Sequence, residues 1–204
     1  MSIVELFTIF KDIFLAGSAV TMAYVAYRGL EKWKSELAGK ADFDVARNLI
    51  RSVYKLRNEI QSCRSLFVSA GEFPEGYRNG MAGLTNREKG DAWLYVYNNR
   101  WNPVFNAIQE FDVSTLEVEA LWGRDAKEKT QALRQLAMRL RVAIDSFLRN
   151  EYSGNQDLAN SDFDVRVRSD LNASGLKGDS LSPAIDSAIE EIEIMIRPHL
   201  KRDY

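Results

Sequence analysis

The residue types that most often carry catalysis or bind metal ions are scarce in this chain. It has one histidine, His199, and one cysteine, Cys63, so neither a zinc site nor a Cys–His nucleophile pair is expected. Neither a P-loop nor a G-x-G-x-x-G turn occurs in the sequence. The sequence therefore predicts a protein that is not an enzyme and that uses no metal ion and no cofactor.

Two other groups of side chains could in principle do chemistry. Four aspartates fall between residues 157 and 170, but without the glycine and glutamate that an EF-hand calcium loop requires: Asp157, Asp162, Asp164 and Asp170. We expect a solvated acidic loop there. Trp93, Tyr97 and Trp101 could stack nucleic-acid bases, yet their spacing of four residues is typical of the buried face of a helix.

The distribution of charge is more informative than its sum. The net charge of −2 argues against a nucleic-acid partner, because such proteins carry a strong basic excess. Residues 28–64 hold nine basic against five acidic side chains, and residues 151–204 hold eleven acidic against six basic ones. A basic segment of this kind favours contact with anionic lipid headgroups. The alternative is that these charges are only the solvated faces of amphipathic helices.

An uncharged run of 15 residues, 13–27, raises the question of a membrane span. As a helix it would measure about 22 Å, against roughly 30 Å of hydrocarbon, so a span must extend toward residue 3 and take in Glu5, Lys11 and Asp12. Lys11 can reach outward, and Asp12 can pair with it. A single-span anchor, a buried or partner-docking helix, and a cleaved signal peptide all remain open.

The flanks of the run predict its orientation. Four basic residues follow it, whereas Lys11 is the only basic side chain before it: Arg28, Lys32, Lys34 and Lys40. The positive-inside rule then places the body in the cytoplasm, with these four residues at the membrane surface and the N-terminus outside. Cys63, the only cysteine, leaves no intrachain disulfide and fits a reducing compartment.

Small residues recur inside the run at steps of three, four and three: Ala16, Ala19, Ala23 and Ala26. Helices in lipid associate through small residues that allow close backbone approach. This stripe predicts a contact between copies of the chain in the lipid bilayer, giving a homo-oligomer. Chance is the alternative, because alanine is common in any helix.

The rest of the chain predicts an all-α protein, with residues 1–40 as anchor and junction and residues 41–204 as a helical domain. Apolar seams mark helices from about residue 42 to 60, over 86–112, over 125–150 and over 182–197, and the anchor runs on into the first of these. We expect a break at Gly39 with Asp42 as the new cap, a kink or fresh start at Pro103, and a short helix capped by Ser114 with Glu117.

Residues 68–83 and 153–180 are rich in glycine or polar residues and predict loops. Within the second, residues 163–168 alternate like a strand but have no partner strand, so an extended segment or a helical turn is expected. Ser182 is the expected N-cap of the last helix, with Pro183 at its first position and Pro198 at its end.

Residues 27–60 resemble a group of uncharacterised bacterial proteins of about this length. The shared features are a short hydrophobic N-terminus, then Gly29–Leu30, Trp33, Glu36–Leu37 and Gly39–Lys40, and a helix with Ala46–Arg47 and Lys55–Leu56–Arg57. The resemblance implies a bacterial source and a helical body. It implies no activity and provides no site residues.

Together these features predict a non-enzymatic scaffold or effector anchored in the bacterial inner membrane. Its anchor oligomerises, and its cytoplasmic helical body binds a protein partner that the sequence does not identify. Bacterial stress and phage-defence modules, where small anchored helical proteins are frequent, are the settings that this type suggests. The alternative is a soluble interaction subunit whose residues 1–28 dock into a partner protein.

Overall fold

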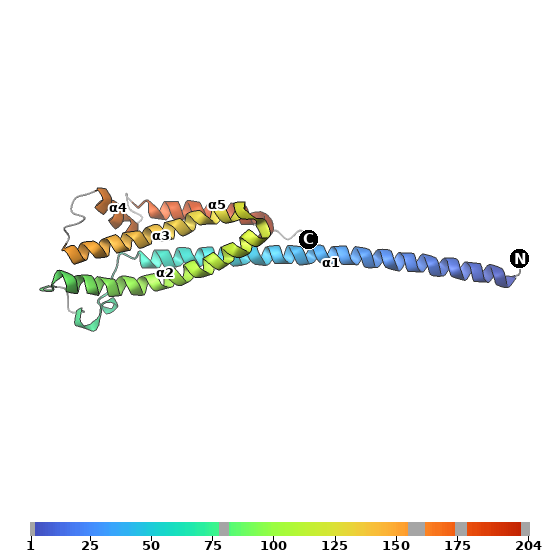
Figure 1. Cartoon of the computed structure of the whole chain (residues 1–204), viewed down its shortest axis with the longest axis horizontal. Helices are drawn as coiled ribbons and strands as arrows, with labels where there is room; N and C mark the ends of the chain where they lie inside the picture. The colour runs from blue at the N-terminus through green and yellow to red at the C-terminus, as the bar shows by residue number, and fades with distance from the viewer. Residues whose placement is uncertain (1–2, 78–81, 155–161, 174–178, 201–204) are drawn as a thin grey trace. The chain divides into compact units, whose positions relative to one another are not determined.

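The computed structural model describes residues 3–77, 82–154, 162–173 and 179–200. Within these ranges the chain is all-helical and has no strand, as predicted (Figure 1). Two short 3-10 turns, Ala70–Glu72 and Glu75–Tyr77, lie between the first two helices. The α-helices are α1 (Ile3–Cys63), α2 (Asn86–Trp122), α3 (Arg124–Ser153), α4 (Asp162–Leu171) and α5 (Leu181–Leu200).

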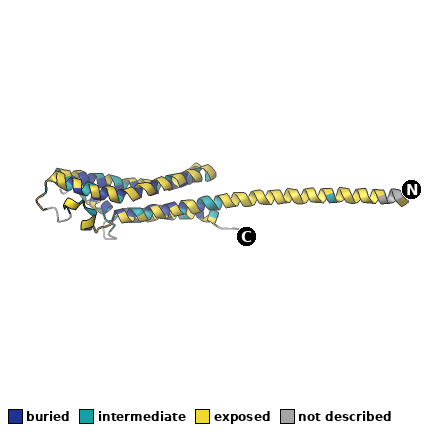
Figure 2. Cartoon of the chain, turned by 90° about the horizontal axis from the view of Figure 1, so that it is seen from below, coloured by how far each residue is buried: buried dark blue, intermediate teal, exposed yellow. Residues whose placement is uncertain are grey.

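The chain divides into two compact units, residues up to Asp44 and residues 45–201. Helix α1 contributes to both. Its residues from Thr8 to Ala41 are almost all exposed, whereas one side of the helix is buried from Ala46 onward (Figure 2).

The second unit is a bundle in which α3 packs against α2, α4 and α5. Its core is built from the seams that the sequence predicts: Ala46, Leu49, Val53, Leu56 and Ile60 from α1; Leu133, Leu140, Ile144 and Leu148 from α3; and Ile185, Ala188, Ile189, Ile192 and Ile196 from α5. Tyr97 and Trp101 of α2 are buried and Trp93 packs against the core, so the expectation for these aromatic residues is confirmed.

Local signals set the limits of the α2–α3 hairpin. At the start of α2, the Thr85 side chain accepts from Glu88 N at 3.3 Å, and the Glu88 carboxylate accepts from Thr85 N at 2.8 Å. This reciprocal capping box satisfies two backbone donors that would otherwise be unpaired. Gly123, between α2 and α3, has a φ of 85°, which residues with a Cβ rarely adopt, so glycine permits this sharp reversal.

The expected break at Gly39 is wrong, because α1 is continuous through Gly39 and Asp42. A glycine inside a helix costs only about 1 kcal/mol relative to alanine, and the helical residues on both sides outweigh it.

Two expectations for α2 are corrected: of the kink or fresh start expected at Pro103 the fresh start is wrong, while the kink stays a prediction, and the N-cap at Ser114 is wrong. The helix does not start afresh at Pro103; it continues to Trp122, with Trp101 and Val104 both buried in the core. Packing on both sides offsets the backbone hydrogen bond that proline cannot make. Ser114 is not an N-cap, because its hydroxyl donates to the Glu110 carbonyl at 3.1 Å inside the same helix.

The C-terminal third shows one confirmation and two corrections. Residues 163–168 belong to α4, so the helical alternative is confirmed and the extended one is wrong. Helix α5 begins at Leu181, and the Asp179 carboxylate, not Ser182, accepts from the first backbone amides, Leu181 N and Ser182 N, both at 3.1 Å. Pro198 lies inside α5, which extends to Leu200.

Candidate functional site

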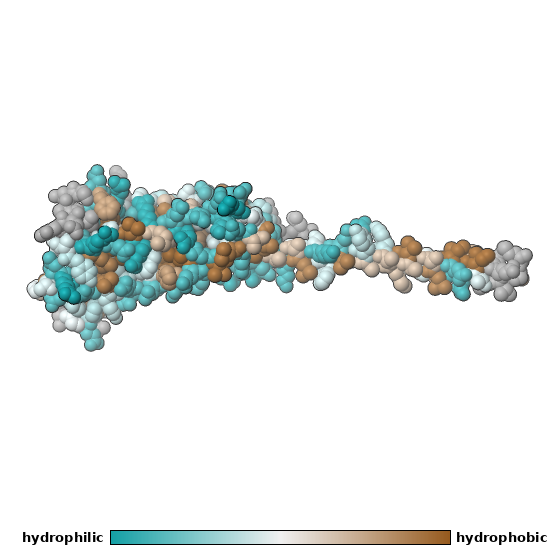
Figure 3. All heavy atoms as spheres, viewed as in Figure 1, coloured by the Kyte–Doolittle hydropathy of each residue, from teal (hydrophilic) through white to brown (hydrophobic). Residues whose placement is uncertain are grey.

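The N-terminal half of α1 exposes large apolar side chains along its length (Figure 3). The four alanines of the predicted stripe lie on this exposed helix. Around them lie Phe10, Ile13, Phe14, Leu15, Val20, Met22, Tyr24, Val25 and Tyr27. A surface of this extent is unusual for a soluble protein; in other proteins such patches are typical of sites that bind lipid or another protein.

The polar groups within this segment have partners in the helix itself. The Ser18 hydroxyl donates to the Leu15 carbonyl at 2.9 Å, and the Thr21 hydroxyl donates to the Gly17 carbonyl at 2.8 Å. Lys11 Nζ lies 3.7 Å from an Asp12 carboxylate oxygen, as the sequence predicts. Because an unpaired polar group is costly in hydrocarbon, these contacts lower the cost of placing the segment in lipid.

The predicted membrane-surface residues are exposed on the next turns of α1: Arg28, Lys32, Lys34 and Lys40. Arg28 Nε donates to the Tyr24 hydroxyl at 3.0 Å, and the Tyr27 hydroxyl donates to Glu31 at 2.8 Å. Each tyrosine thus joins an apolar ring to a charged neighbour, which is the arrangement that membrane–water interfaces favour.

Among the described helices, α1 is the one long and apolar enough to cross a membrane. None of the membrane-length apolar window in α1 is buried against the rest of the molecule. A helix in the core of a soluble protein passes the same test of length and composition, but it is mostly buried. The exposure therefore distinguishes this segment from the core helix of a soluble protein, but not from a signal sequence, which also lies near the N-terminus.

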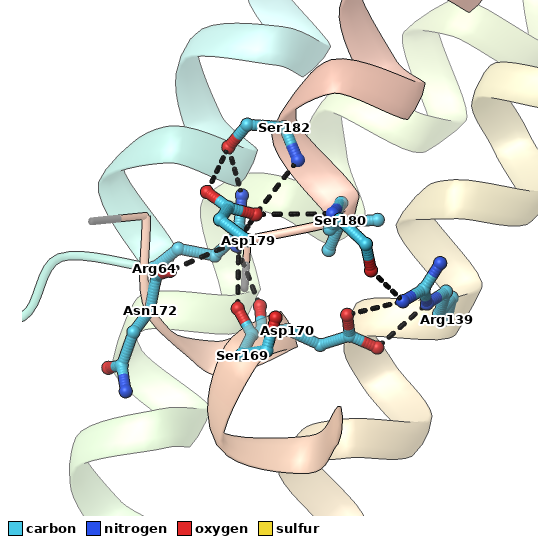
Figure 4. A network of polar contacts seen from close by, with 9 residues as sticks. Arg64, Arg139, Ser169, Asp170, Asn172, Asp179, Ser180 and Ser182 are labelled. Carbon is cyan, nitrogen blue, oxygen red and sulfur yellow. Dashed lines mark hydrogen bonds and ion pairs between the residues drawn. The ribbon is translucent and has the colours of Figure 1, made fainter. Parts of the chain in front are cut away.

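A second notable site lies in the bundle, where Arg64 follows α1 directly and is completely buried (Figure 4). Its guanidinium donates to the backbone carbonyls of Ser169, Asp170 and Asn172 at 3.1, 2.6 and 3.2 Å, at the C-terminal end of α4. Carbonyls at the C-terminal end of a helix carry its partial negative charge, so a cation is favourable there. Arg64 thus caps α4 from outside.

The same guanidinium binds the start of α5. It donates to Asp179 at 2.8 Å and to the Ser182 hydroxyl at 2.7 Å. Burial opposes ionisation of Asp179, but hydrogen bonds from the Ser182 side chain and backbone and from Arg64 outweigh it, so the pKa is lowered to about 2. Arg64 and Asp179 together link the end of α1, the end of α4 and the start of α5.

Arg139 extends this cluster to α3. It forms a two-bonded ion pair with Asp170, at 2.7 and 2.6 Å, and donates to Ser180 at 2.8 Å. The predicted loop is wrong for Asp162, Asp164 and Asp170, which all lie in helix α4. Asp162 is exposed, Asp164 pairs with Arg168 in the same helix, and Asp170 is buried. Asp157 lies outside the described residues.

The other candidate reactive groups are placed in structural roles. Cys63 is buried in the core, and burial raises the pKa of its thiol to about 11. The His199 ring stacks on Trp122 with 4.0 Å between the ring centroids. Among the described residues, no three His, Cys, Asp or Glu side chains gather as a metal site would require.

The arginine cluster is the feature that sequence reasoning missed. One signal could have found it: Arg64 stands four residues after Ile60, so it continues the buried seam of α1 with a charged side chain. A charge on a core face must be paired, but its partners lie more than 100 positions along the chain and share no motif with it.

Comparison of the chain with protein-family models, with curated proteins and with solved structures gives no match.

Proposed function

We propose that this protein is a non-enzymatic, membrane-anchored helical scaffold. In this proposal the apolar N-terminal part of α1 crosses the bacterial inner membrane with its N-terminus outside. The helical bundle lies in the cytoplasm, where it binds a protein partner, and the anchor self-associates through its alanine stripe. The observation that carries the proposal is that no residue of a membrane-length apolar window is buried.

Three further features support an anchor and a scaffold. The hydroxyls of Ser18 and Thr21 bond to helix carbonyls, and the residues just after the apolar run are basic. In the bundle, the Cys63 thiol is buried and held protonated, and the Arg64 guanidinium has five hydrogen bonds to protein groups and is 0% exposed. These groups serve the fold and are closed to a substrate.

The test is alkaline-salt washing of bacterial membranes that contain the full-length protein. The unmodified protein is expected to stay in the pellet and to dissolve only in detergent. The variant Val20→Asp/Val25→Asp should be released, because each central carboxylate costs roughly 2.5–3.5 kcal/mol in the bilayer. The control Val20→Leu/Val25→Leu keeps the segment apolar and should pellet like the unmodified protein.

The outcomes separate the alternatives. Release of the unmodified protein by the wash would favour a soluble subunit whose first 28 residues dock into a partner protein. An intact mass that lacks the first residues would indicate a cleaved signal peptide. Either result contradicts the anchor.

A further inference from the structure

The alanine stripe of α1 continues beyond the apolar run without a change of spacing. The alternating steps of three and four from Ala16 to Ala26 lead on to Leu30, Trp33 and Leu37. Each residue reached by these steps, from 16 to 37, is uncharged and apolar. All seven residues lie on the continuous helix α1. We call this set (Ala16, Ala19, Ala23, Ala26, Leu30, Trp33 and Leu37) the heptad seam.

No other stripe of the helix has this property. Alternating steps of three and four can follow seven different stripes along a helix. Each of the six other stripes carries a charged residue between 28 and 37: Arg28, Glu31, Lys32, Lys34 or Glu36. The buried stripe of the bundle, from Ala46 to Cys63, follows a different register of the repeat, so the heptad seam is not its continuation. The heptad seam is therefore a separate surface of unit 1.

Its large side chains are not covered by the protein. Leu30 is 47% exposed, Trp33 is 58% exposed and Leu37 is 48% exposed. A repeat of 3.5 residues is slightly shorter than the helical repeat of 3.6, and helices with such a seam wind around each other in a left-handed coiled coil. The surface thus fits a partner helix with the same period.

We propose that the heptad seam pairs with the heptad seam of a second copy of this chain, forming a parallel coiled coil that begins in the membrane and continues into the cytoplasm. The inference rests on the proposed function, since it requires the anchor. Copies inserted by the same rule run parallel and in register, so each partner presents small residues in the hydrocarbon and large apolar residues just outside it. A second copy has the same sequence, so it presents small and large residues at the same depths as the first.

Charge placement does not oppose this pairing. In a parallel, in-register coiled coil, the positions that flank the heptad seam bring Gly29 opposite Lys34 and Glu36 opposite Ala41 of the second copy, so like charges do not meet. The three aqueous residues per chain are far fewer than the roughly 20–30 residues a side of a stable interface. The membrane part of the heptad seam must therefore contribute to the association.

The test is a cysteine scan of full-length protein in membranes. Single cysteines are introduced at residues 30–37 and oxidised mildly, with Cys63 left in place because it is buried and protonated. Leu30→Cys, Trp33→Cys and Leu37→Cys should give several-fold more disulfide-linked dimer than Glu31→Cys, Lys32→Cys and Ser35→Cys. Equal yields across the scan, or a maximum on another stripe, would overturn the inference.

A second arm tests whether the two parts of the heptad seam act together. In the Leu37→Cys background, Ala19→Leu/Ala23→Leu should lower the dimer yield several-fold, because bulky groups push the helix backbones apart. The matched change Val20→Leu/Val25→Leu, off the heptad seam, should leave it unchanged. Equal yields in the two backgrounds would show that the membrane part makes no contact.

The alkaline-salt wash distinguishes failure of the coiled-coil inference from failure of the proposed membrane anchor. If the protein pellets but shows no preferred cross-linking positions, the anchor is supported and the coiled coil is contradicted. Protein that is released by the wash loses the anchor, whatever its cross-linking pattern.

Discussion

Helix α1 contains two regions of similar apolar character that are used differently. Before residue 45, Leu15, Leu30 and Leu37 are exposed, with Leu15 at 57%, whereas Leu49 and Leu56 farther along are 0% exposed. Both regions repeat apolar residues at steps of three and four. Periodicity therefore predicts that a helix has an apolar face, but what covers that face depends on the rest of the chain, on lipid or on another molecule.

The polar contacts of the two regions differ in the same way. In the first region the ion pairs Lys11–Asp12 and Lys32–Glu36 are well exposed, at 3.7 and 3.9 Å. Directly after the second, Arg64 forms a buried pair with Asp179 at 2.8 Å. Exposed pairs contribute little to stability, whereas a buried pair becomes costly when one partner is removed. This contrast can be tested residue by residue.

The largest effect is expected from Arg64→Ala. It leaves Asp179 buried without its cation and removes the donor to three carbonyls at the end of α4, which should lower the free energy of unfolding of the bundle by about 3–5 kcal/mol. Arg64→Lys keeps the charge but not the planar guanidinium with its several donors. Its free energy of unfolding should lie between those of the unmodified protein and Arg64→Ala. The measurement is urea unfolding of full-length protein in mild detergent, followed by near-ultraviolet circular dichroism. As the control, Arg28→Ala in the first region should have no effect; a similar loss for both would remove the contrast.

The next effect compares two leucines of the same helix. Leu56→Ala opens a cavity in the core and should cost about 2–5 kcal/mol in the same unfolding measurement. Leu15→Ala removes a side chain that touches little of the protein, so bundle stability should not change. If Leu15→Ala destabilised the bundle as much as Leu56→Ala, the two regions would not be energetically separate.

The smallest of the three effects concerns pH. Because the pKa of Asp179 is lowered from 3.8 to about 2, its contribution is present above pH 4 and is lost as the pH falls toward 2. The difference in unfolding free energy between the unmodified protein and Asp179→Asn should be constant from pH 7 to 4 and then narrow by about 2 kcal/mol by pH 2. Glu36→Gln, in an exposed pair, should change stability by no more than roughly 0.5 kcal/mol at any pH. If the difference in unfolding free energy between the unmodified protein and Asp179→Asn stayed constant down to pH 2, the lowered pKa of Asp179 would be contradicted.

The sequence predicts the seams of α1, α3 and α5 correctly because each repeats over several turns, and periodic burial is a property of the local sequence. It fails at Gly39, where the helical residues on both sides outweigh a glycine cost of about 1 kcal/mol. It also fails for the fresh start at Pro103 and the cap at Ser114, where a local signal competes with packing from many side chains. Segments that are distant in the sequence supply that packing, so a local pattern cannot weigh it.

The arginine cluster could not be predicted in the same way. Arg64 binds groups from residues 169 to 182, and neither the loop before α5 nor the short helix α4 carries a motif that points back to it. Only the position of a charged residue on a buried seam gives a warning. For the exposed apolar segment the sequence predicts the location and the flanking charges, and the structure adds that none of the apolar window is buried.

The distance along the chain between Arg64 and its partners also has a consequence for synthesis. Ser182 lies 118 positions after Arg64. At roughly 5–20 residues per second, a ribosome needs about 6–24 s to make this stretch. The apolar N-terminus is therefore available for insertion well before the guanidinium has any of its final acceptors. Helices α2 and α3 are made during that interval, whereas α5 follows only at its end, so in the proposed function anchoring can precede completion of the bundle on every chain.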